Sequence, residues 1–159
     1  MKLPVTRYYG SKRRVVDKIW HALRNAHIKF NSFLDLFGGT GIVSYYMLAK
    51  GKQVCYNDLF AFNCENAKAL LASPKNTLNE SEALELLKRV PGVDYDNVIE
   101  RNYHGIYYLD QENRLIDTIV QNIARLPKEK QASAYYLLNQ TCLIKRPFNL
   151  FHRRNLNLR

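Results

Sequence analysis

One short part of the chain, residues 33–44 followed by residues 53–58, constrains the fold more than any other. The sequence Phe-Leu-Asp-Leu-Phe-Gly-Gly-Thr-Gly-Ile-Val-Ser predicts a buried strand, a glycine-rich turn and the start of a helix, and Gln-Val-Cys-Tyr-Asn-Asp predicts a second strand that ends in an acid. Glycines lack a Cβ, so the backbone here can bend tightly and lie close to a ligand. A strand, a helix and a second strand in this order predict an α/β fold with parallel strands.

Hydrophobic spacing and helix-end signals predict the other elements. Only two strands are expected, and the rest of the chain is helical or irregular. The expected elements are a helix from an N-cap at Ser11 to about Asn25, strands at 32–37 and 53–57, helices at 41–50 and 60–72, a helix capped by Asn79 that runs to about residue 89, a loop of about fifteen residues from Pro91, a helix capped by Asp110, and a last helix from Pro127 or Lys128 to about Leu143.

The first strand is expected to lack a neighbour. Its side chains are apolar on both sides of Asp35, which is typical of a strand at the centre of a sheet. The second strand can supply one neighbour, and no other segment obviously supplies the second. Because an unpaired strand edge is prone to association, we expect the sheet to be completed by something outside this chain.

Charge and composition indicate a polyanion-binding globular protein of one domain's length. The net charge is +10, and the excess lies at the two ends, since residues 1–14 and 144–159 each carry five bases and no acid. Solvated charge that happens to cluster is the alternative. There is no apolar run near 18 residues and no secretory signal, so we expect a cytoplasmic protein without a membrane segment. The scattered cysteines, Cys55, Cys64 and Cys142, are expected to be reduced core thiols without a metal.

The glycine-rich turn favours a nucleoside-type ligand over a purely structural turn. Gly39-Thr-Gly-Ile-Val-Ser44 lacks only the last glycine of the dinucleotide pattern, and Asp58 follows where ribose hydroxyls are usually held. No Lys-Ser/Thr pair follows the glycines, which argues against a loop that binds nucleotide phosphates. Asp35 is a buried acid that would hold backbone amides or a ligand's ammonium group, or would only tie down the loop.

Three segments together, Tyr8-Tyr-Gly-Ser-Lys12, Asp35-Leu-Phe-Gly-Gly-Thr-Gly41 and Asn57-Asp58, resemble the S-adenosylmethionine-binding half of Dam-like DNA adenine-N6 methyltransferases of the restriction-modification type. Residues 103–113 and 145–155 are also similar to that family. The resemblance implies a partial Rossmann-like sheet in residues 1–75, a helical part in 76–143, and a basic DNA-facing tail in 144–159. It further implies S-adenosylmethionine as cofactor and double-stranded DNA as partner.

The resemblance also implies roles for matching residues. Lys12 would lie near the methionine carboxylate, Asp58 would bind the ribose hydroxyls, and Leu59 would lie beside the adenine. The full cofactor-binding set is Tyr8, Lys12, Asp35, Phe37, Gly38, Gly39, Thr40, Gly41, Asp58 and Leu59, and the DNA-facing residues are Lys145, Arg146, Arg153 and Arg154.

The sequence departs from the family at the catalytic signature, Asp/Asn-Pro-Pro-Tyr/Phe/Trp, whose aromatic stacks on the flipped adenine. None of the five prolines adjoins another, so no catalytic residue can be assigned. The chain is therefore expected to be inactive alone. Three explanations for the missing signature are open. The chain is a subunit of a split enzyme whose second polypeptide carries the signature, or a truncated product that lacks the C-terminal segment. The third is that the protein lost catalysis and kept binding. The competing hypotheses are a non-enzymatic nucleic-acid-binding or regulatory subunit and a nicotinamide-dependent Rossmann protein.

Overall fold

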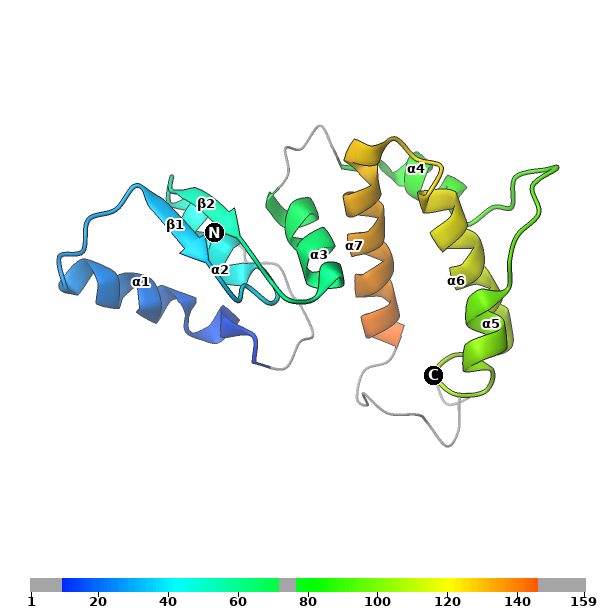
Figure 1. Cartoon of the computed structure of the whole chain (residues 1–159), viewed down its shortest axis with the longest axis horizontal. Coiled ribbons are helices and arrows are strands. Elements are labelled where there is room, and N and C mark those ends of the chain that lie inside the picture. The colour runs from blue at the N-terminus through cyan, green and yellow to red at the C-terminus, as the bar shows by residue number, and fades with distance from the viewer. Residues whose placement is uncertain (1–9, 72–76, 146–159) are drawn as a thin grey trace. The chain divides into compact units, whose positions relative to one another are not determined.

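The computed structural model describes residues 10–71 and 77–145, and the chain divides into two compact units, residues 1–75 and 76–159. The described part of the N-terminal unit contains a 3-10 helix, three α-helices and two strands (Figure 1). Its elements are η1 (Lys12–Arg14), α1 (Val16–Asn25), β1 (Ser32–Asp35), α2 (Ile42–Ala49), β2 (Gln53–Tyr56) and α3 (Ala61–Leu71).

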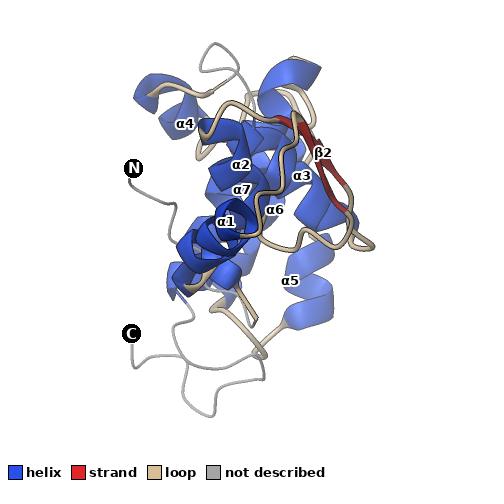
Figure 2. Cartoon of the chain, turned by 90° about the vertical axis from the view of Figure 1, so that its left-hand side faces the viewer, coloured by secondary structure: helices blue, strands red, loops and turns tan. Residues whose placement is uncertain are grey.

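The two strands form a parallel sheet in which Ser32 pairs with Gln53 and Asp35 with Tyr56. Helix α2 connects them, and α1 and α2 lie on the same side of the strands (Figure 2). Phe33 and Val54 point from the sheet into the core between these helices, which is built from Val16, Ile42, Val43, Tyr46 and Met47 with Ile19, Trp20, Leu23 and Phe30 around them. This packing fixes the carboxyl ends of both strands beside the start of α2.

In the C-terminal unit, the described residues 77–145 form helices joined by irregular segments, and they include no strand. The unit contains α4 (Glu80–Glu85), α5 (Val98–Tyr103), α6 (Asp110–Ile123) and α7 (Lys128–Lys145). Leu86, Ile123 and Ala134 form its small buried core. The expected mixed α/β class with two strands, followed by helices, is therefore confirmed. In the described segments no helix combines the length and apolarity needed to cross a bilayer.

Two expectations for the N-terminal unit were wrong. Ser11 precedes η1 but its side chain caps no helix, and the long first helix begins only at Val16. Cys55 is exposed rather than buried, while Cys64 and Cys142 are half-buried. The exposure of Cys55 follows from the sheet, because its side chain points away from α1 and α2 and no described residue covers that face.

Helix α4 has the predicted capping box, since the Asn79 side chain accepts from Glu82 N and Glu82 accepts from Asn79 N. However, α4 ends at Glu85, earlier than expected. Asp110 is the first residue of α6 rather than its cap, and Glu112 accepts the hydrogen bond from the backbone N–H of Leu109.

The segment after Pro91 is not a continuous loop, because it contains α5. The carboxylate of Asp117 on α6 accepts hydrogen bonds from Ile99 N at 2.8 Å and Glu100 N at 3.0 Å. These amides belong to the first turn of α5, which has no side-chain cap from its own N-cap residue Asn97. A residue that is distant in sequence therefore accepts the hydrogen bonds of the first backbone N–H groups of α5.

A second buried polar residue of α6, Asn122, fixes the segment between α4 and α5. Its amide donates to the carbonyls of Leu86 and Lys88, and its oxygen accepts from the Tyr95 hydroxyl at 2.6 Å. The same hydroxyl accepts from Val90 N. Buried polar groups need such partners, so this network determines the path of the chain here.

Candidate functional site

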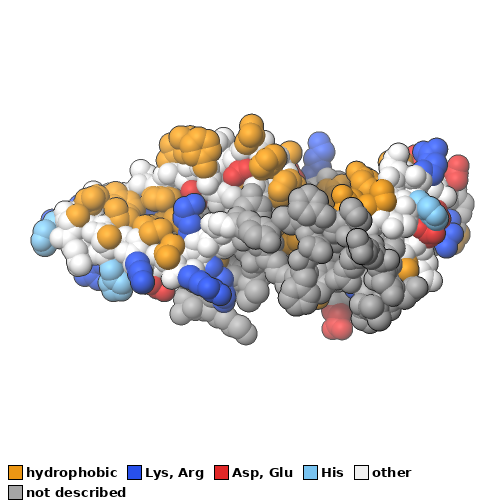
Figure 3. Space-filling model, turned by 90° about the horizontal axis from the view of Figure 1, so that it is seen from below, with side chains coloured by type: hydrophobic (Ala, Val, Ile, Leu, Met, Phe, Trp, Pro, Cys, Tyr) orange, Lys and Arg blue, Asp and Glu red, His pale blue; other side chains and the backbone are white. Residues whose placement is uncertain are grey.

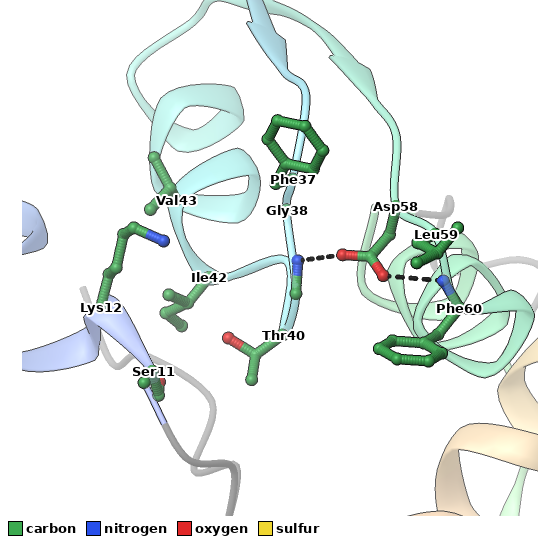
Figure 4. A pocket seen from close by; sticks show the side chains of 12 residues that line it. Ser11, Lys12, Phe37, Gly38, Thr40, Ile42, Val43, Asp58, Leu59 and Phe60 are labelled. Carbon is green, nitrogen blue, oxygen red and sulfur yellow. Dashed lines mark hydrogen bonds between the residues drawn. The ribbon is translucent and has the colours of Figure 1, made fainter.

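A cavity of about 310 Å³ lies in the N-terminal unit, where the carboxyl ends of both strands meet the start of α2. This volume is near the lower end of the range of small-molecule sites. Figure 4 shows residues from three separate parts of the sequence around it. The lining residues are Gly10, Ser11 and Lys12, then Phe37, Gly38, Gly39, Thr40, Ile42 and Val43, then Asp58, Leu59 and Phe60.

The three segments that the sequence singled out thus meet at one cavity. Lys12 lies on one side of it and Asp58 on the other, with the glycine-rich turn between them (Figure 4). A cation and an anion separated by an apolar and glycine-lined space suit a ligand with an acidic group at one end and hydroxyl groups at the other. Phe37 and Leu59 are 74% and 85% exposed, so they leave apolar surface at the cavity uncovered.

Asp58 is held by the backbone around it. Its Oδ2 accepts from Gly39 N at 2.7 Å, and its Oδ1 accepts from Phe60 N and Asn63 Nδ2, each at 3.0 Å. Partial burial, the largest single influence, raises the pKa of Asp58, but the hydrogen bonds from Asn63, Phe60, Gly39 and Leu59 together outweigh it and lower the pKa. The carboxylate is therefore ionised at neutral pH and already oriented.

The turn needs glycine at two positions for different reasons. Gly41, the N-cap of α2, has a φ of 69°, a left-handed conformation that other residues rarely adopt. At Gly38 the reason is space, because an added Cβ would lie 2.1 Å from Cε2 of Tyr56. The Tyr56 hydroxyl in turn donates to the carbonyl of Gly39 at 2.6 Å. The aromatic ring of β2 therefore packs directly against the turn.

Asp35 and Gly41, two residues of the predicted cofactor set, do not line the cavity. Asp35 Oδ2 accepts a hydrogen bond at 2.7 Å from the Ser44 hydroxyl, which is fully buried on α2. This bond ties the end of β1 to α2. The geometry agrees with the alternative that Asp35 secures the loop.

Five lining residues were not in the predicted set: Gly10, Ser11, Ile42, Val43 and Phe60. Ser11 is the most informative, because its Oγ is buried and has no hydrogen-bond partner among the described residues. A buried hydroxyl without a partner is unfavourable, so this atom is suited to a polar ligand group. The sequence did contain a signal for Ser11, because it directly precedes Lys12, which was in the predicted cofactor-binding set.

Tyr8 of the cofactor set, and Arg146, Arg153 and Arg154 of the DNA-facing set, lie outside the described residues. Lys145, at the end of α7, is described, and its Nζ lies 3.4 Å from Glu112 Oε1. The Lys145 side chain is 57% exposed, so solvent screens its attraction to Glu112.

Comparison with known proteins places the chain in a family. Residues 8–154 match the D12 class N6 adenine-specific DNA methyltransferases, and the chain belongs to this family. A curated relative is the type II methyltransferase M2.HphI of Haemophilus parahaemolyticus, which is 26% identical over 151 residues. The match covers 94% of this chain but only 43% of the relative, so the chain spans less than half the length of that protein. No solved structure matches the chain significantly.

Proposed function

We propose that this chain is the cofactor-binding part of a site-specific DNA adenine methyltransferase and that its cavity binds S-adenosylmethionine. The observation that carries the proposal is the meeting of Lys12, the glycine-rich turn and Asp58 at one cavity in a chain of the D12 class family. When bound, the cofactor supplies a methyl group activated by a sulfonium, for transfer to N6 of adenine in DNA.

The side chains around the cavity suit the parts of this cofactor. The ammonium of Lys12 would pair with the methionine carboxylate, and the buried Ser11 hydroxyl next to it can donate a further hydrogen bond. At the other side, Asp58 Oδ2 would accept from a ribose hydroxyl while it keeps its bond to Gly39 N. The exposed Phe37 and Leu59 side chains would cover the adenine.

The methyl transfer itself needs residues that this sequence does not contain. No Pro-Pro pair is present to form the family's catalytic signature, and the curated relative is more than twice as long as the matched part. We therefore infer that a second polypeptide, or a C-terminal segment, supplies the signature. The chain alone should bind the cofactor without methylating DNA.

Double-stranded DNA is the proposed substrate, and Lys145, Arg146, Arg153 and Arg154 are the proposed contacts to its phosphates. The name of the Haemophilus relative, a type II methyltransferase, supports a place in a restriction-modification system. Because the proposed substrate is DNA, the place of action would be the cytoplasm.

Titration calorimetry of the full chain with S-adenosylmethionine tests the proposal, with NAD as the comparison ligand. We expect saturable 1:1 binding of S-adenosylmethionine and none of NAD. Binding of NAD alone would support a nicotinamide-dependent protein instead. Salt-sensitive binding of DNA without affinity for either cofactor would support a non-enzymatic nucleic-acid-binding subunit.

A further inference from the structure

Two arginines of the C-terminal unit lie over the ring of one buried tyrosine. The guanidinium carbon of Arg89 lies 5.0 Å from the centre of the Tyr95 ring, and that of Arg125 lies 5.2 Å from it. Both arginines are exposed, whereas Tyr95 is only 7% exposed. The two guanidinium carbons cannot be farther apart than the sum of these two distances. We call these three residues the arginine clamp.

The ring that carries the two arginines is fixed in place. The Tyr95 hydroxyl donates to Asn122 Oδ1 at 2.6 Å and accepts from Val90 N at 3.0 Å. Attraction between a guanidinium and an aromatic face holds each arginine over the ring. Because the ring cannot swing away, the arginines are already placed before any ligand arrives. An anion that binds to them therefore has less side-chain freedom to remove.

Both guanidinium groups have N–H donors to spare. An arginine presents five of them. Within the part of the chain that the structure describes, Arg125 donates from Nη1 to the carbonyl of Gln121 at 3.0 Å, and Arg89 makes no hydrogen bond. Neither arginine forms an ion pair with a described residue. The carbonyls at the end of α6 attract Arg125, but they do not explain the position of Arg89.

Other bases of the same unit are neutralised by acids, and the clamp differs from them. The pairs are Lys88 with Glu85, Arg114 with Glu100, Lys130 with Glu82 and Lys145 with Glu112. Figure 3 shows basic and acidic side chains next to one another on one face of this unit. Asp94 and Asp96 flank Tyr95 in the sequence, yet neither pairs with an arginine of the clamp. Since two like charges over one ring repel each other, a bound anion would stabilise the arrangement.

We propose that the arginine clamp binds a phosphate group of the DNA backbone. Guanidinium groups and phosphates form paired, charge-assisted hydrogen bonds, which suit two arginines with free donors. This inference rests on the proposed function, because the proposed substrate makes DNA the source of the phosphate.

The clamp is a contact separate from the basic tail. Its residues lie at the end of α6, whereas Lys145 lies beside Glu112 in the first turn of that helix. A helix of 14 residues is about 21 Å long, so the clamp and Lys145 would bind different phosphates.

The test measures how salt affects the binding of the full chain to a fluorescent DNA duplex of arbitrary sequence. Arg89→Gln combined with Arg125→Gln should lower the slope of log affinity against log salt by about 0.9, the value for one phosphate that is no longer neutralised. Either single variant should produce most of this decrease, because both arginines would hold the same phosphate. Arg24→Gln combined with Arg101→Gln is the charge-matched control, since both positions are exposed and lie outside the clamp.

The role of the ring is tested by two variants of Tyr95. Tyr95→Phe keeps the aromatic face and should keep the slope, although it removes the hydrogen bond to Asn122. Tyr95→Leu removes the face that holds the arginines and should lower the slope as the arginine variants do. Circular dichroism confirms that each variant is folded at the temperature of the binding measurement. A folded Tyr95→Leu chain with the full slope would contradict the positioning role of the ring.

Two further measurements on the same samples separate the possible outcomes. If the clamp double variant has the slope of the control, the proposal is overturned, while binding of DNA and of S-adenosylmethionine by the unaltered chain leaves the proposed function standing. Calorimetry with inorganic phosphate gives the second comparison. Saturable binding that the clamp variant loses, together with an unchanged DNA slope, would identify a site for free phosphate and contradict a DNA contact. Failure to bind S-adenosylmethionine, with the slope difference present, would overturn the proposed function instead.

Discussion

Lys12 and Asp58 lie on opposite sides of one cavity, although they belong to the first and the third of the segments that form it. The glycine-rich turn at the start of α2 separates them. Their separation gives the cavity a cationic end and an anionic end. The cationic end can be tested with a ligand that lacks the carboxylate, and the anionic end with variants of Asp58.

Lys12→Gln should weaken binding of S-adenosylhomocysteine by roughly 1–3 kcal/mol, the usual worth of a hydrogen bond to a charged group. It should leave binding of 5′-methylthioadenosine unchanged, because that compound keeps the nucleoside and the thioether but lacks the amino-acid part. Calorimetry with both ligands measures the difference. Lys18→Gln, at an exposed position on α1, is the control for loss of one positive charge. Equal losses with both ligands would contradict the placement of Lys12 at the carboxylate.

Asp58→Asn should weaken the binding of S-adenosylhomocysteine and of 5′-methylthioadenosine, because both ligands carry the ribose. For Asp58→Ala we expect a loss of roughly 1–3 kcal/mol in the free energy of binding.

Asp58→Asn should also change how the stability of the chain depends on pH. The folded-state pKa of Asp58 is lowered, so its stabilising contribution is present above its unfolded pKa and is lost as the pH falls through the folded pKa. The difference in melting temperature between the wild-type chain and Asp58→Asn should therefore be constant above about pH 5 and shrink below about pH 4. A difference unchanged down to about pH 2 would show that this carboxylate is not stabilised by its hydrogen bonds.

Gly38→Ala should destabilise the N-terminal unit by roughly 1–3 kcal/mol, because the added methyl group displaces the ring of Tyr56. Tyr56→Phe removes only the hydroxyl that donates to Gly39 O and should cost about 1 kcal/mol. Urea denaturation of both variants and of the double variant measures the coupling. The double variant should lose less stability than the sum of the two, because a displaced ring no longer brings its hydroxyl to Gly39 O, and additive effects would contradict the displacement of the ring.

Replacement of Arg153 and Arg154 by Ala should lower DNA affinity and reduce the slope of log affinity against log salt by roughly 1.8, or about 0.9 for each phosphate that is no longer neutralised. Lys145→Ala should change the slope by less, because Glu112 already lies near that ammonium. Fluorescence anisotropy at several salt concentrations provides the slopes. Ala at both Lys18 and Lys128, two exposed lysines outside the basic ends, is the matched control. If the arginine variant matches this control, the basic tail does not contact DNA.

Local signals predicted those features whose causes lie within a few neighbouring residues. The glycines of the turn, the two short strands and the Asn79–Glu82 capping box all act over short spans, and each appears in the structure. The family resemblance added what local signals could not, namely the expectation that Lys12 and Asp58 lie close together, and both line the cavity.

The features that the sequence did not reveal depend on distant partners. Helix α5 was interpreted as a loop because its cap, Asp117, lies on α6 rather than next to it. Cys55 was expected to be a core thiol because the cysteines are scattered along the sequence, whereas in the structure Cys55 is exposed and no described residue covers its face of the sheet. Ser11 was expected to cap a helix, but its side chain caps none, its hydroxyl is buried without a partner among the described residues, and the residue lines the cavity. Each of these features depends on contacts between residues that are far apart in the sequence, and a local sequence pattern does not show such contacts.

Both peptide groups of Gly39 are engaged by residues of the segment that contains β2, its N–H by Asp58 and its C=O by Tyr56. These two hydrogen bonds hold the centre of the turn in a structure that contains no ligand. A ligand that binds here therefore does not have to order the turn. The entropy cost of ordering is avoided, which makes binding tighter. Preorganisation of this kind predicts that the Gly39 amide is protected from hydrogen exchange in the empty protein and gains little protection when the cavity is filled.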